Sequence, residues 1–167
     1  VCEFCVTPDE YFEFTLLENG TYSIKAKNAQ NMPSEIVIPS KYNGNAVTVI
    51  GYDAFYGCAD ITSITIPNGI TVIENYAFAG CGMLKDINTP NSVTIPDSVT
   101  YIGEEAFNRC QNLTSVTIGD GVTEIRDYTF SACTSLTNVS IGDSVTYIGE
   151  GAFAFCRNLT SITIPNS

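Results

Sequence analysis

Residues 136–156, LTNVSIGDSVTYIGEGAFAFC, contain one complete unit of a repeat that runs through most of this 167-residue chain. The most recognisable part of the unit is a small residue, a Phe, two variable residues and a Cys. Five such blocks occur, at residues 54–58, 77–81, 106–110, 129–133 and 152–156, and their cysteines are 23, 29, 23 and 23 positions apart. Self-similarity at a fixed period of this length is typical of solenoid proteins, in which each repeat forms one coil.

Each unit contains sub-motifs that predict different local structures. From Asn138 to Ile141, polar and apolar residues alternate and β-branched residues are frequent, which indicates a half-buried strand. The Gly-Asp pair that begins at Gly142 predicts a turn. The spacing of Val145 and Ile148 suits a corner or short bridge, and the Ala-Phe-x-x-Cys block suits one short helical turn. One unit cannot cover its own apolar face, so we expect the units to stack.

These motifs resemble the BspA-like, treponemal-type leucine-rich repeat family, whose pattern is Leu-x-x-Ile-x-Ile-Pro-x-x-Val-x-x-Ile-Gly-x-x-Ala-Phe-x-x-Cys. Residues 136–156 match the pattern nearly in full, and the resemblance covers about residues 36–167. It implies an α/β repeat fold, a curved leucine-rich-repeat solenoid with a parallel sheet on its concave side. It also implies a bacterial surface or secreted protein that binds partner molecules.

Two copies depart from the pattern by insertions. The first copy carries extra residues at 41–45, and the copy that begins at Leu84 carries six extra residues within 85–96. Because Ile87 to Pro90 looks like a degraded strand and turn, we expect the extra residues just after the strand. We expect residues 41–45 at the same place in the first copy. The last copy is truncated.

The first 35 residues predict a β-hairpin that precedes the repeats of residues 36–167. An Asn-Gly pair at Asn19 separates two apolar runs, residues 11–17 and 21–26, and this is the strongest short-range hairpin signal. Because the first coil of a solenoid needs a cover, we expect the hairpin to be an N-terminal cap. No equivalent segment follows the last copy, so we expect further repeats in a longer parent protein or end-to-end self-association through the uncapped coil.

The composition argues against several classes of protein. Hydrophobic residues make up 44% of the chain and charged residues 15%, which excludes intrinsic disorder, and no apolar run reaches the roughly 18 residues of a membrane span. The net charge of -11 disfavours nucleic acid and anionic membrane surfaces as partners. The chain has no histidine, the usual general base near neutral pH and the commonest metal ligand. We therefore expect no enzyme activity and no cofactor.

The seven cysteines and the recurring turn aspartates have competing interpretations. The five repeat cysteines have no histidine to activate them and would lie in a row, so we expect buried small hydrophobes. Cys2 and Cys5 form a lone C-x-x-C, for which a disulfide and free thiols both stay open. We expect Asp97, Asp120 and Asp143 to accept hydrogen bonds from turn amides, with calcium binding as the alternative.

A partner-binding surface is expected on the outward strand positions. Their side chains are short and polar, and they form a smooth, hydroxyl-rich face: Ser115, Thr117, Asn138, Ser140, Ser161 and Thr163. Tyr101 and Tyr147 occupy the same variable position of the Val-Thr-x-Ile element and add aromatic area, which favours recognition because tyrosine loses little entropy on binding. These eight residues are the predicted binding surface.

The sequence therefore predicts a non-catalytic recognition module, secreted or at the cell surface, that binds protein on a bacterium or on a host. Glycan or cell-wall binding through Tyr101 and Tyr147 is the first alternative. A structural spacer within a larger surface protein is the second. We expect neither a nucleic-acid partner nor insertion into a membrane.

Overall fold

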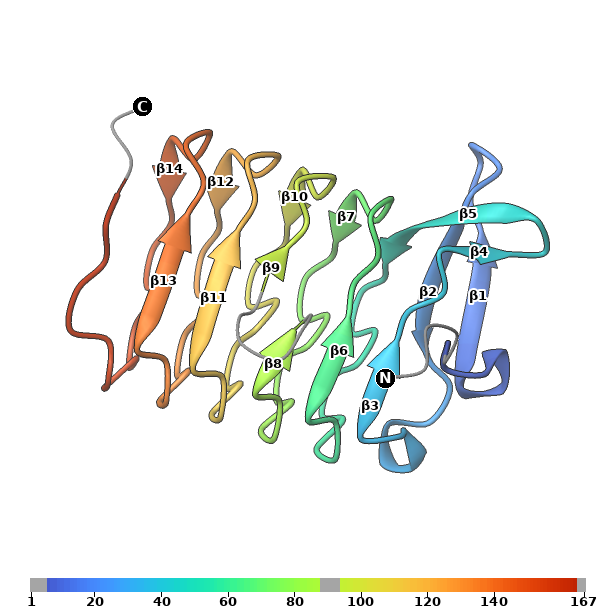
Figure 1. The fold of residues 1–167 in the computed structure, drawn as a ribbon, viewed down its shortest axis with the longest axis horizontal. Helices are drawn as coiled ribbons and strands as arrows, with labels where there is room; N and C mark the ends of the chain where they lie inside the picture. Colours follow the sequence, from blue (N-terminus) through green and yellow to red (C-terminus); the bar gives the residue numbers. More distant parts are fainter. Residues whose placement is uncertain (1–5, 88–93, 165–167) are drawn as a thin grey trace.

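The structure is a computed structural model that describes residues 6–87 and 94–164. The repeats form stacked coils that lie side by side in chain order, with a hairpin at one end and residue 164 at the other (Figure 1). The predicted solenoid is thereby confirmed. Within the described ranges the only helices are the 3-10 turns η1 (Asp9–Tyr11) and η2 (Ala29–Asn31), and none has the length or apolar character of a membrane span.

The alternating segments form the first parallel sheet along one side of the coils. In β13 the side chains of Val139 and Ile141 are buried and those of Asn138 and Ser140 are exposed, as the period of two predicts. Identical repeat positions pair across the sheet, for example Val116 with Val139. The strands are β3 (Glu35–Val37), β6 (Ser63–Thr65), β8 (Asp86–Ile87), β9 (Thr94–Ile95), β11 (Ser115–Ile118) and β13 (Asn138–Ile141).

The Val-x-x-Ile elements form shorter parallel strands on a second side. Apart from β5, each is two residues long, which agrees with the predicted bridge. Ile73 lies in register between Ile50 and Ile102, and all three are buried. The strands are β5 (Asn45–Ile50), β7 (Val72–Ile73), β10 (Tyr101–Ile102), β12 (Glu124–Ile125) and β14 (Tyr147–Ile148).

The Ala-Phe-x-x-Cys blocks are successions of tight turns, and the short helical turn expected there is absent from the described residues. The reason lies in the amides, which alternate between two kinds of partner. The Ala77 and Cys81 amides bond within their coil, to Glu74 and Phe78, whereas the Phe78 amide donates to the Ala106 carbonyl of the next coil at 2.7 Å. A helix would use every amide internally and leave the next coil unbonded.

This succession of turns needs a left-handed backbone at two positions in every coil, one directly before the Ala-Phe-x-x-Cys block and one within it. The turn closed by Gly51 and Ala54 has Asp53 as its third residue, with φ of 55°, which is the mark of a type II turn. The third residue of the next such turn in each block is also left-handed. These positions have φ between 54° and 77°: Asp53, Tyr76, Glu105, Tyr128 and Gly151, then Gly57, Gly80, Arg109, Ala132 and Phe155.

A ladder of phenylalanine rings runs through the core. Successive rings are nearly parallel, and their centroids are 5.1–5.5 Å apart. The ring planes differ by 18° between Phe78 and Phe107 but by 7° or less at the other steps. Leu, Ile, Val and Cys side chains of the same coils surround the ladder and are buried with it. The rings are those of Phe55, Phe78, Phe107, Phe130 and Phe153.

The hairpin predicted in the first 35 residues forms and lies against the first coil. Strands β1 (Phe12–Leu16) and β2 (Tyr22–Ala26) pair antiparallel, and β2 continues the second sheet by pairing in parallel with β5. In the turn, the Asn19 side chain accepts from the Thr21 amide, and Gly20 has φ of 82°. Phe12 meets Phe55 edge to face with a centroid distance of 6.3 Å. The domain boundary at residue 35 stays a prediction.

The two insertions take different places in their coils. Residues 41–45 follow the first strand as expected and form a second hairpin, in which β4 (Lys41–Tyr42) pairs with the start of β5. The expectation for the copy from Leu84 is wrong, because the extra residues divide the strand instead of following it. Residues 86–87 pair with β6, residues 94–95 pair with β11, and 88–93 lie between them, outside the described residues.

Asp and Asn side chains join neighbouring coils, and a glycine makes room for each. Asp120 Oδ1 accepts from the Asp143 amide at 3.1 Å, and a side-chain atom added at the preceding Gly142 would lie 2.7 Å from that oxygen. The same arrangement recurs at three other places, one of them at this coil junction and two at other junctions. There the accepting residues are Asp97, Asn75 and Asp127, and the glycines are Gly119, Gly103 and Gly149.

The ladder leads to a first prediction. Phe107→Ala should lower the free energy of unfolding by about 3–5 kcal/mol, because a large buried ring is lost between two others. Thr117→Ala, on the half-buried outer side of β11, should change it little. Denaturant titration followed by circular dichroism measures both values, and equal losses would contradict the inside and outside assignment.

The glycine positions lead to a second prediction. Gly142→Ala should destabilise the protein by about 1–3 kcal/mol, since the methyl group would meet the Asp120 carboxylate and the Gly119 carbonyl. Gly82→Ala is the matched control, because the nearest atom to its added methyl would be 4.0 Å away. Thermal unfolding of the two variants tests the difference, and similar melting temperatures would argue against the close approach.

Candidate binding surface

The five repeat cysteines lie inside the solenoid, as predicted. All are buried and free, and the Sγ atoms of the last four donate to the phenylalanine carbonyl of the preceding coil, as Cys81 does to Phe55 at 3.1 Å. Burial raises the pKa of Cys58 to about 12 and that of Cys156 to about 11, and it raises the pKa of Cys81 and Cys110 well above the usual range. Protonated thiols are poor nucleophiles and poor metal ligands.

The remaining chemistry-bearing candidates are the turn aspartates and the first two cysteines. The carboxylates of Asp97 and Asp120 accept turn amides of the next coil, as expected, whereas Asp143 lies in the last coil and lines the cavity beside β13. In residues 6–87 and 94–164 no three acidic or cysteine side chains gather as a metal site would require. Cys2 and Cys5 lie outside the described residues.

The strand residues of the predicted binding surface lie on two different sides of the coils. Ser115 and Thr117 on β11 and Asn138 and Ser140 on β13 share the outer face of the first sheet. Tyr101 belongs to β10 and Tyr147 to β14, which are strands on the second side of the coils. The eight residues therefore do not form one continuous face.

Ser161 and Thr163 are exposed but belong to no strand, although their segment has the alternating pattern. A cavity of about 400 Å³ lies between this segment and β13, and it is lined by Asn138, Ser140 and Thr163 among others. The structure thus brings three of the predicted residues together. No aromatic residue is among the lining residues, since the others are Val139, Ile141 and Asp143.

Tyr101 and Tyr147 have different surroundings. The Tyr147 side chain is 55% exposed. The Tyr101 ring is half-buried, its hydroxyl donates to Asn75 Oδ1 at 3.4 Å, and the Arg126 guanidinium lies 4.7 Å from its centroid. Arg126 also pairs with Glu124 at 2.9 Å. At the repeat position that the two tyrosines share, the Tyr147 ring is thus exposed, whereas the Tyr101 ring is held by Asn75 and Arg126.

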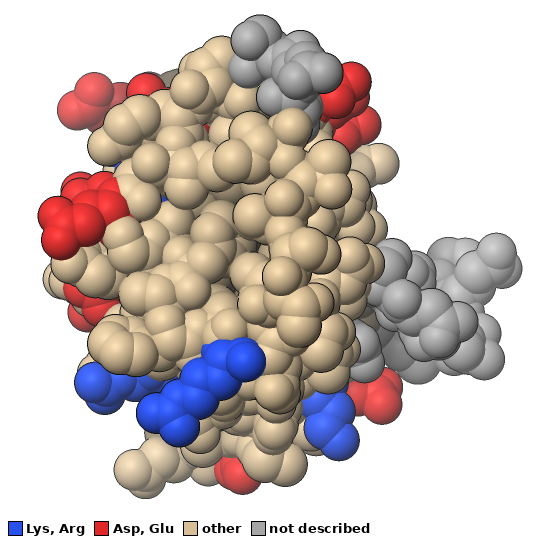
Figure 2. Space-filling view, turned by 90° about the vertical axis from the view of Figure 1, so that its left-hand side faces the viewer, with Lys and Arg blue, Asp and Glu red and all other residues tan. Residues whose placement is uncertain are grey.

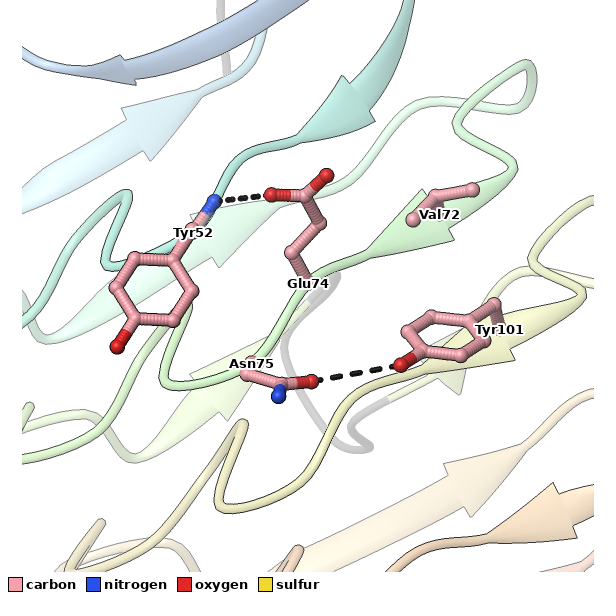
Figure 3. A pocket seen from close by; sticks show the side chains of 5 residues that line it. All are labelled: Tyr52, Val72, Glu74, Asn75 and Tyr101. Carbon is pink, nitrogen blue, oxygen red and sulfur yellow. Dashed lines mark hydrogen bonds between the residues drawn. The ribbon is translucent and has the colours of Figure 1, made fainter.

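A cavity of about 470 Å³ opens beside the held ring. It is lined by Tyr52, Val72, Glu74, Asn75 and Tyr101, with the two tyrosine rings on opposite sides of the hollow (Figure 3). Glu74 Oε2 accepts from the Tyr52 amide at 2.6 Å, which fixes the carboxylate. The Asn75 oxygen accepts from Tyr101 and also from the Glu104 amide at 3.1 Å.

Glu74 occupies a repeat position that is glycine in both adjacent coils. The register of β5, β7 and β10 aligns Glu74 with Gly51 and Gly103, which follow Ile50 and Ile102. Among the three aligned positions, only Glu74 carries a side chain. Sequence reasoning missed Glu74, Asn75 and Val72, although a comparison of the same position in each repeat would have marked Glu74 as an acid between two glycines.

Further tyrosines lie next to this cavity. Tyr52 meets Tyr76 edge to face at a centroid distance of 5.7 Å, and the Tyr76 hydroxyl donates to Glu105 at 3.1 Å. That hydrogen bond and the negative charge of Glu105 raise the pKa of Tyr76, so its hydroxyl stays protonated. Tyr76 also lines a smaller cavity of about 260 Å³ together with Tyr56. The turn side of the first coils therefore presents several aromatic rings, of which Tyr76 is held by an acid.

The end of the solenoid formed by the last coil has little charge. Figure 2 shows this end, where uncharged residues fill the centre and charged side chains lie towards the rim. Phe155 is 70% exposed and Ile164 58%, while Phe153 is partly buried as the last ring of the ladder.

The fold and its surface define a leucine-rich-repeat solenoid. The chain belongs to the BspA-type leucine-rich repeat family: the family model described as BspA type Leucine rich repeat region (6 copies) matches residues 28–95 and 91–167. The resemblance seen in the sequence is thereby confirmed. No curated protein sequence matches the chain.

Solved structures of bacterial leucine-rich repeat proteins are similar to it. One from Bacteroides capillosus is 28% identical over 78% of this chain and 94% of its own, with a TM-score of 0.65. A leucine rich cell surface protein from Faecalibacterium prausnitzii is 28% identical over 96% of this chain, with a TM-score of 0.63, and the chain spans 54% of that protein. A T. pallidum leucine rich repeat protein, 23% identical over 93% and 91% of the two chains with a TM-score of 0.51, shares the fold.

The buried thiols lead to a third prediction. In a Cys2→Ser, Cys5→Ser variant, the folded protein should resist iodoacetamide at about pH 9, whereas the denatured protein should take up one label per cysteine. The reason is that burial places the pKa of Cys156 near 11 and that of Cys58 near 12, above the 9.0 of an exposed thiol. Mass spectrometry counts the labels, and rapid labelling of the folded variant would contradict the burial.

Proposed function

We propose that this chain is a non-catalytic recognition module, secreted or displayed at a bacterial surface, that binds other proteins. Adhesion to a bacterium or to a host is the role that fits such a module. In this proposal the binding surface comprises the outer face of β11 and β13, the segment with Ser161 and Thr163, and the tyrosines of the second sheet.

The distribution of reactive and aromatic groups supports this proposal. The five repeat thiols, which are strong nucleophiles when ionised, lie buried inside the coils, and burial raises the pKa of Cys58 and Cys156. Tyrosines lie outside instead, with Tyr52 and Tyr56 each 58% exposed and Tyr147 55% exposed. Exposed tyrosines on a rigid backbone favour protein recognition, because they contribute contact area and a hydrogen-bonding group while losing few rotamers.

The similar structures support the location in the proposal. The Faecalibacterium prausnitzii protein is named a leucine rich cell surface protein, and it is 28% identical over nearly the whole of this chain. The net charge of -11 also agrees with a protein partner, because it repels nucleic acid and anionic lipid.

Binding to a defined panel of purified bacterial surface and host extracellular-matrix proteins tests the proposal. We expect saturable binding to at least one member in biolayer interferometry. Ser140→Arg, which places a large cation on the outer face of β13, should weaken that binding by about tenfold. Thr15→Arg is the matched control, because Thr15 is also an exposed strand residue but lies on the hairpin.

Two other results would replace the proposal. If no panel protein binds but a glycan array shows saturable binding, and Tyr101→Ala and Tyr147→Ala abolish that binding, the chain is a glycan-binding module. If neither assay shows binding, a structural spacer is favoured. Turnover of any substrate in a broad hydrolase panel would overturn the non-catalytic assignment.

A further inference from the structure

We propose that the cavity between Tyr52 and Tyr101 receives a lysine or arginine side chain of the protein partner. This inference rests on the proposed function and adds to it the chemistry of one contact. The cavity of about 470 Å³ is open to solvent through the exposed Tyr52 ring and is large enough for a long side chain.

The walls of the cavity suit the stem of such a side chain. Tyr52 and Tyr101 stand on opposite sides, and Val72 lies on the same side as Tyr101 in Figure 3. An aliphatic stem of three or four carbons can lie along these surfaces while its charged end extends further, as lysine and arginine do on apolar surfaces elsewhere. The ring faces also attract a cation directly.

Glu74 supplies the charge complement. It is the only ionised group among the lining residues of this cavity. Its Oε2 atom is fixed by the Tyr52 amide, and its other oxygen is turned away from that bond (Figure 3). Asn75 adds an amide, whose oxygen already accepts from Tyr101 and the Glu104 amide. The fixed groups of the cavity thus place a carboxylate where a cation needs a partner, and no cation is among the lining residues.

The chain already shows a cation on one of these rings. The Arg126 guanidinium lies 4.7 Å from the Tyr101 centroid, and its charge is balanced by Glu124 at 2.9 Å. Arg126 comes from the coil that follows Tyr101, whereas Tyr52, Val72 and Glu74 come from the coils that precede it. A partner cation beside Glu74 would repeat on the cavity side the combination of ring and acid that holds Arg126.

The alternative occupant of a tyrosine-lined hollow is a neutral sugar. A sugar would use the ring faces but would gain nothing from a full negative charge beside them. The net charge of -11 further raises the local concentration of cationic segments and not that of neutral sugars. The charge therefore favours lysine or arginine, and a sugar is an outcome that the experiment distinguishes.

Titration of the folded, ¹⁵N-labelled chain with blocked pentapeptides tests the inference. The peptides are Gly-Gly-X-Gly-Gly with Lys, Arg, acetyl-lysine or Glu at X, and methyl glucoside is added as a separate probe. We expect saturable shifts of the amide signals of Tyr52, Glu74 and Tyr101 with the Lys and Arg peptides alone. Raising the salt from about 0.05 M to about 0.5 M should weaken them, because exposed charges are screened.

Two pairs of variants give the residue-level test. Glu74→Gln keeps an acceptor for the Tyr52 amide and should weaken binding of the Lys peptide about three- to fivefold, whereas Glu150→Gln, which removes the same charge three coils further on, should not. Tyr101→Leu should weaken it to a similar extent, and Tyr128→Leu, which removes an exposed ring outside this cavity, should leave it unchanged. Circular dichroism melts check that each variant is folded, and Tyr52→Leu replaces any that is not.

Each alternative result overturns the inference. These results are equal responses to all four peptides, shifts centred outside the cavity, no shift at all, or saturation by methyl glucoside instead of lysine. The proposed function is judged separately. A panel protein that binds the wild-type chain and the Glu74→Gln variant equally would leave the recognition module standing and remove this cavity from its binding surface.

Discussion

Each coil depends on its neighbours because the faces of its phenylalanine ring are covered by the phenylalanine rings of the adjacent coils. The ring of Phe107 is covered on both faces by Phe78 and Phe130, at 5.1 and 5.2 Å. In the Ala-Phe-x-x-Cys blocks, every second amide donates a hydrogen bond to the following coil, as the Phe78 amide does to the Ala106 carbonyl. Local structure and coil contacts are thus one set of interactions, and a single coil would keep neither.

This dependence also determines where chemistry is allowed. The repeat position of Cys110 faces the ladder, so its thiol is buried and stays protonated. The residues at positions that face solvent vary between coils, and their contacts depend on the residues at the same position in the preceding and following coils. Glu74 lies between Gly51 and Gly103 of the adjacent coils, and its carboxylate lines the cavity that has Tyr52 and Tyr101 on opposite sides. The binding surface is therefore a property of neighbouring coils and not of one repeat.

Much of the fold was predictable from the sequence, because the period and the alternation of apolar residues directly reflect burial. The strand from Asn138 to Ile141, the buried cysteines and the hairpin around Asn19 follow from such patterns. The tight turns of the Ala-Phe-x-x-Cys blocks could not be predicted in this way, because the spacing of apolar residues does not show which amide bonds to which coil. The cavity was missed for a similar reason: it arises from residues 23 and 29 positions apart that matter only once the coils are aligned.

The insertion at residues 88–93 has a mechanical consequence. Among the described residues, the first sheet is in two parts, β3-β6-β8 and β9-β11-β13, and the strands of the second side are also in two parts, β1-β2-β5-β7-β10 and β12-β14. In the coil that contains β9 and β10, the ring plane of Phe107 differs by 18° from that of Phe78, the largest rotation in the stack. A molecule pulled from both ends would meet interrupted strand pairing on both sides at this coil, whereas the coils before and after it are joined by strand pairs on both sides. The array would then separate into two blocks of coils before either block unravels.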